Sequence, residues 1–218
     1  MEERASYSQS GQDRYVAEVL FKERRGGFFV EAGAADGLWI SNTLLLERKY
    51  GWTGILVEPT RAFTQLQSNR QNCRLENACL AGVRKTLTLV EIFDAGQAMM
   101  SPEARNNLLL SRTVDVAPEK LSQMDSWWGR AQKQYEVQAK PLAEVLKAHD
   151  APNYIDYLSL DVEGFEYEIL STFPFDEYRF GCLGIEKATE LLTLLLAANG
   201  YVPVRVLGED TFFLPADR

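Results

Sequence analysis

Hydrophobic and polar residues alternate along this chain in a pattern that predicts strands and helices in turn. Short apolar runs are typical of buried strands, whereas apolar residues spaced three and four apart are typical of helices. The short runs predict strands at 28–31, 54–58, 77–81, 87–92, 156–161, 182–186, 201–206 and 211–214. The helical spacing predicts helices at 7–22, 42–50, 63–69, 142–149, 166–172 and 189–199.

The order of these elements predicts an α/β fold. Strands that alternate with helices favour parallel pairing in a doubly wound sheet. The last two predicted strands are joined by the short segment Gly208-Glu-Asp210, so we expect an antiparallel pair at one edge of the sheet. No internal repeat or linker divides the 218 residues, and we therefore expect one domain over 1–218.

Residues 94–134 interrupt this pattern, because they have no clear strand period. Segments of this length within a compact domain are usually functional lids or disordered. The aromatic content, which includes Trp127 and Trp128, argues against disorder. We therefore expect a lid over the acceptor site, in which the two tryptophans stack on a sugar ring, cover the pocket or belong to the core.

Composition and charge exclude several classes of protein. No run of eighteen apolar residues exists, and residues 1–20 lack the apolar centre of a secretory signal, so we expect a cytoplasmic protein without a membrane span. The net charge of −8, with no basic cluster longer than Lys22–Arg25, argues against a nucleic-acid partner. Cys73, Cys79 and Cys182 lack the spacing of a zinc site, and we expect them to be thiols without disulfides.

Acidic residues follow four of the predicted strands. Glu31 and Asp36 follow the first strand, Glu58 ends the second, and Asp161, Glu163 and Glu186 follow two later strands. Because the carboxyl ends of parallel strands meet at one edge of a sheet, where ligands bind, these carboxylates predict a single functional site.

The loop after the first strand indicates what this site binds. Its pattern, Glu31-x-Gly33-x-x-Asp36-Gly37, differs from the dinucleotide fingerprint Gly-x-Gly-x-x-Gly, in which added carboxylates would repel a pyrophosphate. Carboxylates suit a cationic cofactor that carries an ammonium and a sulfonium group. Glu58 can accept hydrogen bonds from the ribose hydroxyls of an adenosine. Together these residues predict S-adenosylmethionine, although a generic tight turn and a carboxylate facing water would give the same residues.

The sequence resembles the FkbM-type methyltransferases of the class I, Rossmann-like superfamily, over nearly the whole chain except residues 94–134. The matching stretches are Ser8-Gln-Ser-Gly-Gln-Asp13, Gly27-Phe-Phe-Val-Glu-Ala-Gly-Ala-Ala-Asp-Gly37, Ser41-Asn-Thr43, Gly51-Trp-Thr-Gly-Ile-Leu-Val-Glu-Pro59, Tyr157-Leu-Ser-Leu-Asp-Val-Glu-Gly-Phe-Glu166, Gly200-Tyr201 and Asp210-Thr-Phe-Phe213.

This resemblance implies a mostly parallel, seven-stranded sheet and methyl transfer from S-adenosyl-L-methionine to a hydroxyl on a sugar, a glycan or a polyketide-like metabolite. It implies that Asp161 lies beside the sulfonium and that Glu58 holds the ribose. It also implies roles for a further set of residues, which surround the methionine part (Glu31, Gly33, Asp36), close over the cofactor (Gln9, Gln12, Asp13) or support the first loop (Ser41, Asn42).

An alcohol acceptor needs a base, or a metal that lowers its pKa. Asp161, Glu163 and Glu186 are candidates for either task, because converging carboxylates call for a shared proton or a cation such as Mg²⁺. Alternatively, they orient loops through backbone N–H groups. His149, the single histidine, is a weaker candidate for the base, since it also suits a helix C-terminus.

Two other functions use the same features. An NAD(P)-dependent oxidoreductase shares the sheet and the ribose carboxylate, but the missing third glycine and Glu31 count against it. A non-catalytic scaffold would bind the cofactor without turning over any acceptor. Monomer and homodimer are both compatible with the sequence.

Overall fold

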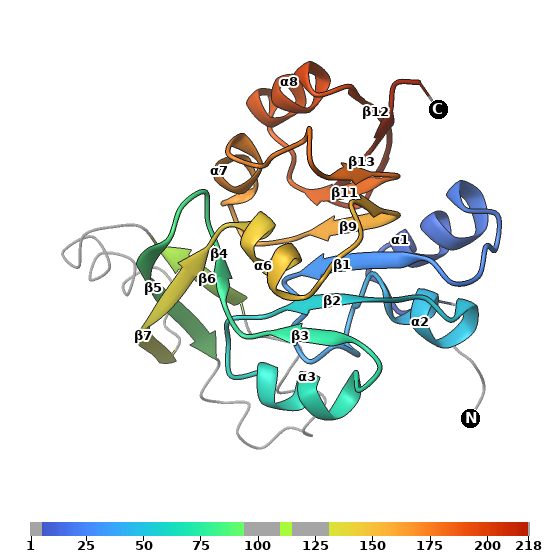
Figure 1. The fold of residues 1–218 in the computed structure, drawn as a ribbon. Helices are drawn as coiled ribbons and strands as arrows, with labels where there is room; N and C mark the ends of the chain where they lie inside the picture. Colours follow the sequence, from blue (N-terminus) through green and yellow to red (C-terminus); the bar gives the residue numbers. More distant parts are fainter. Residues whose placement is uncertain (1–5, 94–109, 115–130, 218) are drawn as a thin grey trace.

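A seven-stranded, mostly parallel sheet forms the centre of the computed structural model, which describes residues 6–93, 110–114 and 131–217 (Figure 1). The strand order is β12-β13-β11-β9-β1-β2-β3. The strands are β1 (Phe28–Ala32), β2 (Thr53–Val57), β3 (Arg74–Glu76), β9 (Tyr157–Leu160), β11 (Leu183–Glu186), β12 (Tyr201–Leu207) and β13 (Asp210–Pro215). The predicted α/β fold is therefore confirmed.

The order of strands reverses at β1, which lies between β9 and β2. From β1 the chain runs outward through β2 and β3, and it then returns to add β9 and β11 on the other side, all in parallel. Ligands of open parallel sheets bind at such a reversal, outside the carboxyl ends of the strands. The expected site therefore lies where β1 and β9 end.

The predicted antiparallel pair lies at the β12 edge of the sheet. The C-terminal strand, β13, is inserted between β11 and β12 and runs antiparallel to both. The edge itself is formed by β12, whose pairing with β13 shifts register between Pro203 and Arg205.

Helices cover both faces of the sheet because alternate residues of each buried strand face opposite sides. Val30 and Ile55 belong to the core beneath α6 (Leu142–Ala148), α7 (Glu166–Ser171) and α8 (Glu190–Ala198). Phe29 and Leu56 belong to the core on the opposite face. The elements of that face are α1 (Gln12–Arg14), the π-helix η1 (Tyr15–Leu20), α2 (Leu44–Tyr50) and α3 (Phe63–Asn69).

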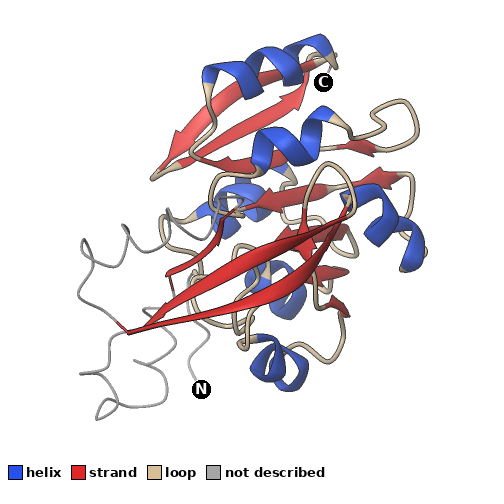
Figure 2. Cartoon of the chain, turned by 90° about the vertical axis from the view of Figure 1, so that its left-hand side faces the viewer, coloured by secondary structure: helices blue, strands red, loops and turns tan. Residues whose placement is uncertain are grey.

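A second sheet, with the order β4-β7-β5-β6, lies beside one end of the first (Figures 1 and 2). Its strands are β4 (Cys79–Leu80), β5 (Lys85–Phe93), β6 (Leu110–Val114) and β7 (Ala131–Lys140), and a separate two-stranded sheet joins β8 (Tyr154–Ile155) to β10 (Arg179–Phe180). Residues 110–114 and 131–134 form strands although residues 94–134 show no clear strand period in the sequence. These residues pair with β5 through their backbones, which needs little apolar sequence. Trp127 and Trp128 lie outside the described residues.

Two expectations from composition agree with the structure. Cys73, Cys79 and Cys182 form no disulfide. Over the described ranges, no helix has the length and apolar character that crossing a bilayer would require.

Substitution of Ile55, in the middle of β2, tests how much the main sheet contributes to the stability of the protein. Ile55 is fully buried, so Ile55→Ala removes methyl groups that the surroundings cannot replace and should lower the free energy of unfolding by about 2–5 kcal/mol. Val204→Ala on the exposed edge strand is the control and should change it by no more than about 0.5 kcal/mol. Equal losses in urea unfolding would contradict this assignment of the core.

Candidate functional site

A cavity of about 580 Å³ lies at the carboxyl ends of β1, β2, β9 and β11. Most of the residues that the sequence predicts for the site line it: Gln9, Glu31, Gly33, Asp36, Ser41, Asn42, Glu58, Asp161, Glu163 and Glu186. The structure thus brings together side chains from distant parts of the chain. Gln12 does not line the cavity.

The loop after β1 passes very close to the end of β9. Gly33 has φ +86°, and a Cβ atom built on it would lie 1.9 Å from the carbonyl oxygen of Asp161. The backbone N–H of Gly33 also donates to the carbonyl of Val57, at 3.0 Å. Only glycine fits between these two strands, so this residue fixes the loop at the reversal of strand order.

Glu31 is buried on the face of the sheet that α2 covers. Its carboxylate accepts hydrogen bonds from the backbone N–H of Asn42 at 2.7 Å and from the hydroxyls of Ser41 at 3.0 Å and Thr43 at 2.5 Å. Burial raises the pKa of Glu31, while Arg70 and these hydrogen bonds act in the opposite direction. The carboxylate therefore holds the turn at 41–43 against β1.

Asp36 organises the other half of this loop. Its carboxylate oxygen accepts from the backbone N–H groups of Leu38 at 2.9 Å and Trp39 at 2.8 Å, a local turn that aspartate favours. Trp39 lines the cavity with 40% of its surface exposed. Sequence reasoning missed Trp39, because no pattern marks an isolated aromatic residue in a loop as part of a site.

Glu58 connects the ends of β1 and β2. It is buried, and its two carboxylate oxygens accept from the backbone N–H groups of Ala35 at 2.7 Å and Thr60 at 2.8 Å. These contacts place the carboxylate at the cavity wall beside the first loop.

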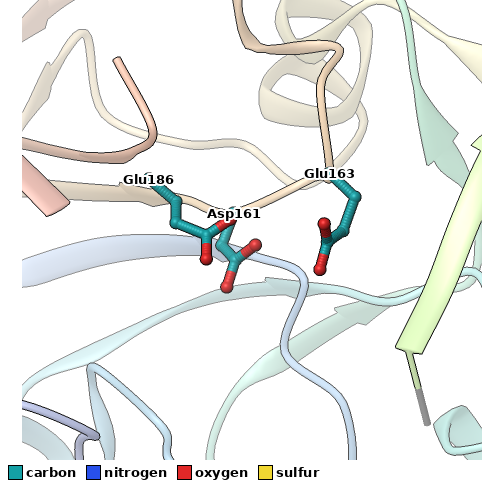
Figure 3. A group of neighbouring side chains, drawn as sticks. All are labelled: Asp161, Glu163 and Glu186. Atoms are coloured by element: carbon teal, nitrogen blue, oxygen red, sulfur yellow. The ribbon is translucent and has the colours of Figure 1, made fainter. Parts of the chain in front are cut away.

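Asp161, Glu163 and Glu186 converge as predicted. Each offers a carboxylate oxygen, and these oxygens lie within 4.8 Å of one another. In Figure 3 the carboxylates of Asp161 and Glu186 lie side by side, with Glu163 farther away. Burial, together with the charges of Glu186 and Glu163, raises the pKa of Asp161 to about 9. Burial and the neighbouring charges therefore favour the neutral form of Asp161.

Lys187 supplies a positive charge to this cluster and was not predicted. Its ammonium lies 3.0 Å from Glu186, 3.2 Å from Glu209 and 3.7 Å from Glu163. Partial burial opposes the charge of Lys187, but the hydrogen bond to Glu186 and the field of Glu163 raise its pKa above the usual value. The three predicted carboxylates could also ligate a divalent cation, which would then compete with this ammonium.

Two other predicted residues fasten the N-terminal segment. Gln12 donates to Asp210 at 2.5 Å, which joins α1 to β13. Asp13 accepts from the backbone N–H of Tyr7 at 2.6 Å and from the hydroxyl of Ser8 at 2.7 Å. Both side chains are buried, and they hold the segment from which Gln9 reaches the cavity.

His149 does not line the cavity. Its Nε2 atom lies 2.8 Å from a carboxylate oxygen of Glu76, whose other oxygen is 2.7 Å from the ammonium of Lys140. This group joins the end of α6 to β3 and β7, a structural role.

Comparison with known proteins found a matching family model and a similar solved structure. The sequence model of a family described as "Methyltransferase FkbM domain" matches residues 31–202, most of the chain. A similar solved structure is precorrin-6y C5,15-methyltransferase from Geobacter metallireducens GS-15, with 10% identity, a TM-score of 0.42, and coverage of 96% of this chain and 90% of that chain. No curated protein matches significantly.

Gly33→Ala tests the close passage of the first loop over β9. The added Cβ would overlap the Asp161 carbonyl, so the loop or β9 must move, at a cost beyond that of the backbone conformation alone. The control is Gly26→Ala, since Gly26 has φ +70° with nothing within 4 Å of its Cβ position and should cost about 1–2 kcal/mol. Thermal unfolding should show a clearly larger loss for Gly33→Ala, and similar losses would mean that the contact is relieved without effect.

Proposed function

The chain belongs to the FkbM methyltransferase domain family, and from that premise we propose that it methylates a hydroxyl group on a sugar, a glycan or a polyketide-like metabolite. S-adenosylmethionine is the methyl donor of this family. The observation that carries the proposal is the carboxylate of Asp161, which lines the cavity beside those of Glu163 and Glu186. An alcohol needs a base of this kind, because its own proton must leave as the methyl group arrives.

The residues present fit S-adenosylmethionine. The cavity volume lies within the usual range of about 300–1,000 Å³ for small-molecule sites. Gly33, Ala34 and Ala35 line it with little side-chain bulk, which lets a ligand approach the backbone. The acidic lining favours a cation over a pyrophosphate, which argues against the alternative of an NAD(P)-dependent oxidoreductase.

Glu58 is proposed to hold the ribose. Its hydrogen bonds to Ala35 and Thr60 orient the carboxylate at the cavity wall. A carboxylate oxygen accepts more than one hydrogen bond, so these contacts are compatible with ribose hydroxyls. Glu31 and Asp36 are proposed to shape the methionine subsite through the turns that they hold, together with Gly33, Ser41 and Asn42, while Gln9 and Gln12 act from the N-terminal segment.

Asp161 is proposed to be the base. Bound S-adenosylmethionine supplies a methyl group on a sulfonium, whose positive charge favours the ionised form of a nearby carboxylate. Once ionised, Asp161 accepts the proton of the acceptor hydroxyl. Glu163 and Glu186 keep its proton affinity high. Alignment of acceptor and donor in the cavity can contribute about 7–11 kcal/mol.

We propose that the carboxylate cluster needs no metal, because Lys187 supplies one positive charge and Asp161 carries a proton until the sulfonium of the bound cofactor takes its place. The ammonium already contacts Glu186 and Glu209 and lies near Glu163. The sequence-based alternative, a divalent cation on Asp161, Glu163 and Glu186, predicts instead that a chelator stops the reaction.

Methyl transfer to hydroxyl acceptors is the direct test. With methyl-labelled S-adenosylmethionine and a panel of sugars, glycans and polyketides, we expect label in base-stable ethers, in the presence of EDTA. Asp161→Asn should lower kcat by about 100-fold or more, as expected for loss of a general base, while the exposed control Asp176→Asn leaves it unchanged.

Label in base-labile esters would contradict the proposal that the acceptor is a hydroxyl group. Activity that requires added Mg²⁺ would contradict the proposal that the carboxylate cluster works without a metal. Tight cofactor binding with no turnover on any acceptor would favour the scaffold.

Glu58→Gln tests the ribose assignment. The loss of a charged acceptor should weaken S-adenosylhomocysteine binding by about tenfold or more in calorimetry. Glu177→Gln, at an exposed position, is the matched control and should bind as the unaltered protein does. NAD in parallel should give no binding. If Glu58→Gln leaves the affinity unchanged, the ribose assignment is wrong.

A further inference from the structure

Arg70 is a fully buried arginine directly after α3 that does not line the cavity. All five N–H groups of its guanidinium have an acceptor. Nη1 donates to the carbonyl of Gly37 at 3.0 Å and to the hydroxyl of Ser41 at 3.1 Å. Nη2 donates to the hydroxyl of Thr43 at 3.0 Å and lies 3.9 Å from the Cys73 sulfur. Nε donates to Glu47.

Three of these acceptors belong to one segment, residues 37–43, which forms a wall of the cavity. Gly37 begins the segment, and Ser41 and Thr43 end it. The guanidinium therefore contacts both ends of the segment without lining the cavity itself. The packing is close: a Cβ on Gly37 would lie 2.6 Å from the Cγ atom of Arg70. The position of this wall therefore depends on where the guanidinium lies.

Arg70 is also linked to Glu31 through two hydroxyl groups. A guanidinium can only donate, so the hydroxyls of Ser41 and Thr43 accept from it. The same hydroxyls donate their own protons to the carboxylate of Glu31, which can only accept, at 3.0 and 2.5 Å. Arg70 thus connects α3 to the end of β1 through two hydroxyl groups.

We propose that Arg70 is a positioning residue that holds residues 37–43 in the form that receives the amino-acid part of the cofactor. This inference rests on the proposed placement of the methionine subsite beside Glu31, Asp36, Ser41 and Asn42. A lysine cannot replace Arg70, because an ammonium has three donors and lacks the planar fork that reaches both ends of the segment.

The test compares two ligands that differ only in the part that Arg70 is proposed to serve. S-adenosylhomocysteine carries the amino-acid part, whereas 5′-methylthioadenosine keeps the nucleoside and the sulfur without it. For Arg70→Lys, we expect calorimetry to show about tenfold or greater loss of S-adenosylhomocysteine affinity, with 5′-methylthioadenosine affinity changed by less than about threefold. A merely structural role would lower both affinities together.

Two further variants keep the outcome decisive. Thr43→Val removes one bridging hydroxyl at similar side-chain volume and should cause the same selective loss, about threefold or more, even if Arg70→Lys does not fold. Leu196→Ala in α8 is the control for a general loss of stability, because it opens the core elsewhere and should leave both affinities within about twofold.

The inference is overturned if Arg70→Lys, or Thr43→Val in its place, binds S-adenosylhomocysteine within twofold of the unaltered protein. Parallel losses for both ligands would also overturn it. Failure of the unaltered protein to bind S-adenosylhomocysteine at all would instead overturn the proposed function, so the two failures are distinguishable.

Discussion

The contact between Gly33 and the carbonyl of Asp161 is the constraint on which the arrangement of the site depends. It brings the first loop against the end of β9, where the strand order reverses. With the loop held there, its N–H groups reach Val57 and Glu58 on the neighbouring strand. The carboxyl ends of three strands are thereby joined by short backbone contacts, and the cavity opens just beyond them.

The groups that surround them divide the carboxylates of the site into two kinds. Glu31 and Glu58 are enclosed by N–H and O–H donors, so their charges are used to hold the backbone in place. Asp161 instead lies beside other carboxylates, and burial together with their charges raises its pKa to about 9. A carboxylate therefore holds the backbone in one part of the cavity, whereas at Asp161 we propose that it acts as the base. The groups around each carboxylate distinguish the two.

Much of the fold could be predicted, because most strands of the main sheet are continuous apolar runs ended by glycine, proline or acidic residues. The site carboxylates were found because parallel strands end at one edge. By contrast, β3 and β7 are polar strands whose backbone pairing leaves little trace in the sequence. Lys187 and Arg70 were missed for a related reason: a charge acquires its role from neighbours that are remote in sequence, which no local pattern records.

The edge strand β12 has a consequence for how copies of this chain can associate. Val202, Val204 and Val206 are exposed there, and an apolar edge of this kind invites a strand from another molecule. Pro203 removes one backbone donor, and the register shift beside it bends the ladder out of line. Continuous strand addition at this edge is therefore disfavoured. The protein can expose three valines at alternate positions and remain protected against polymerisation through them.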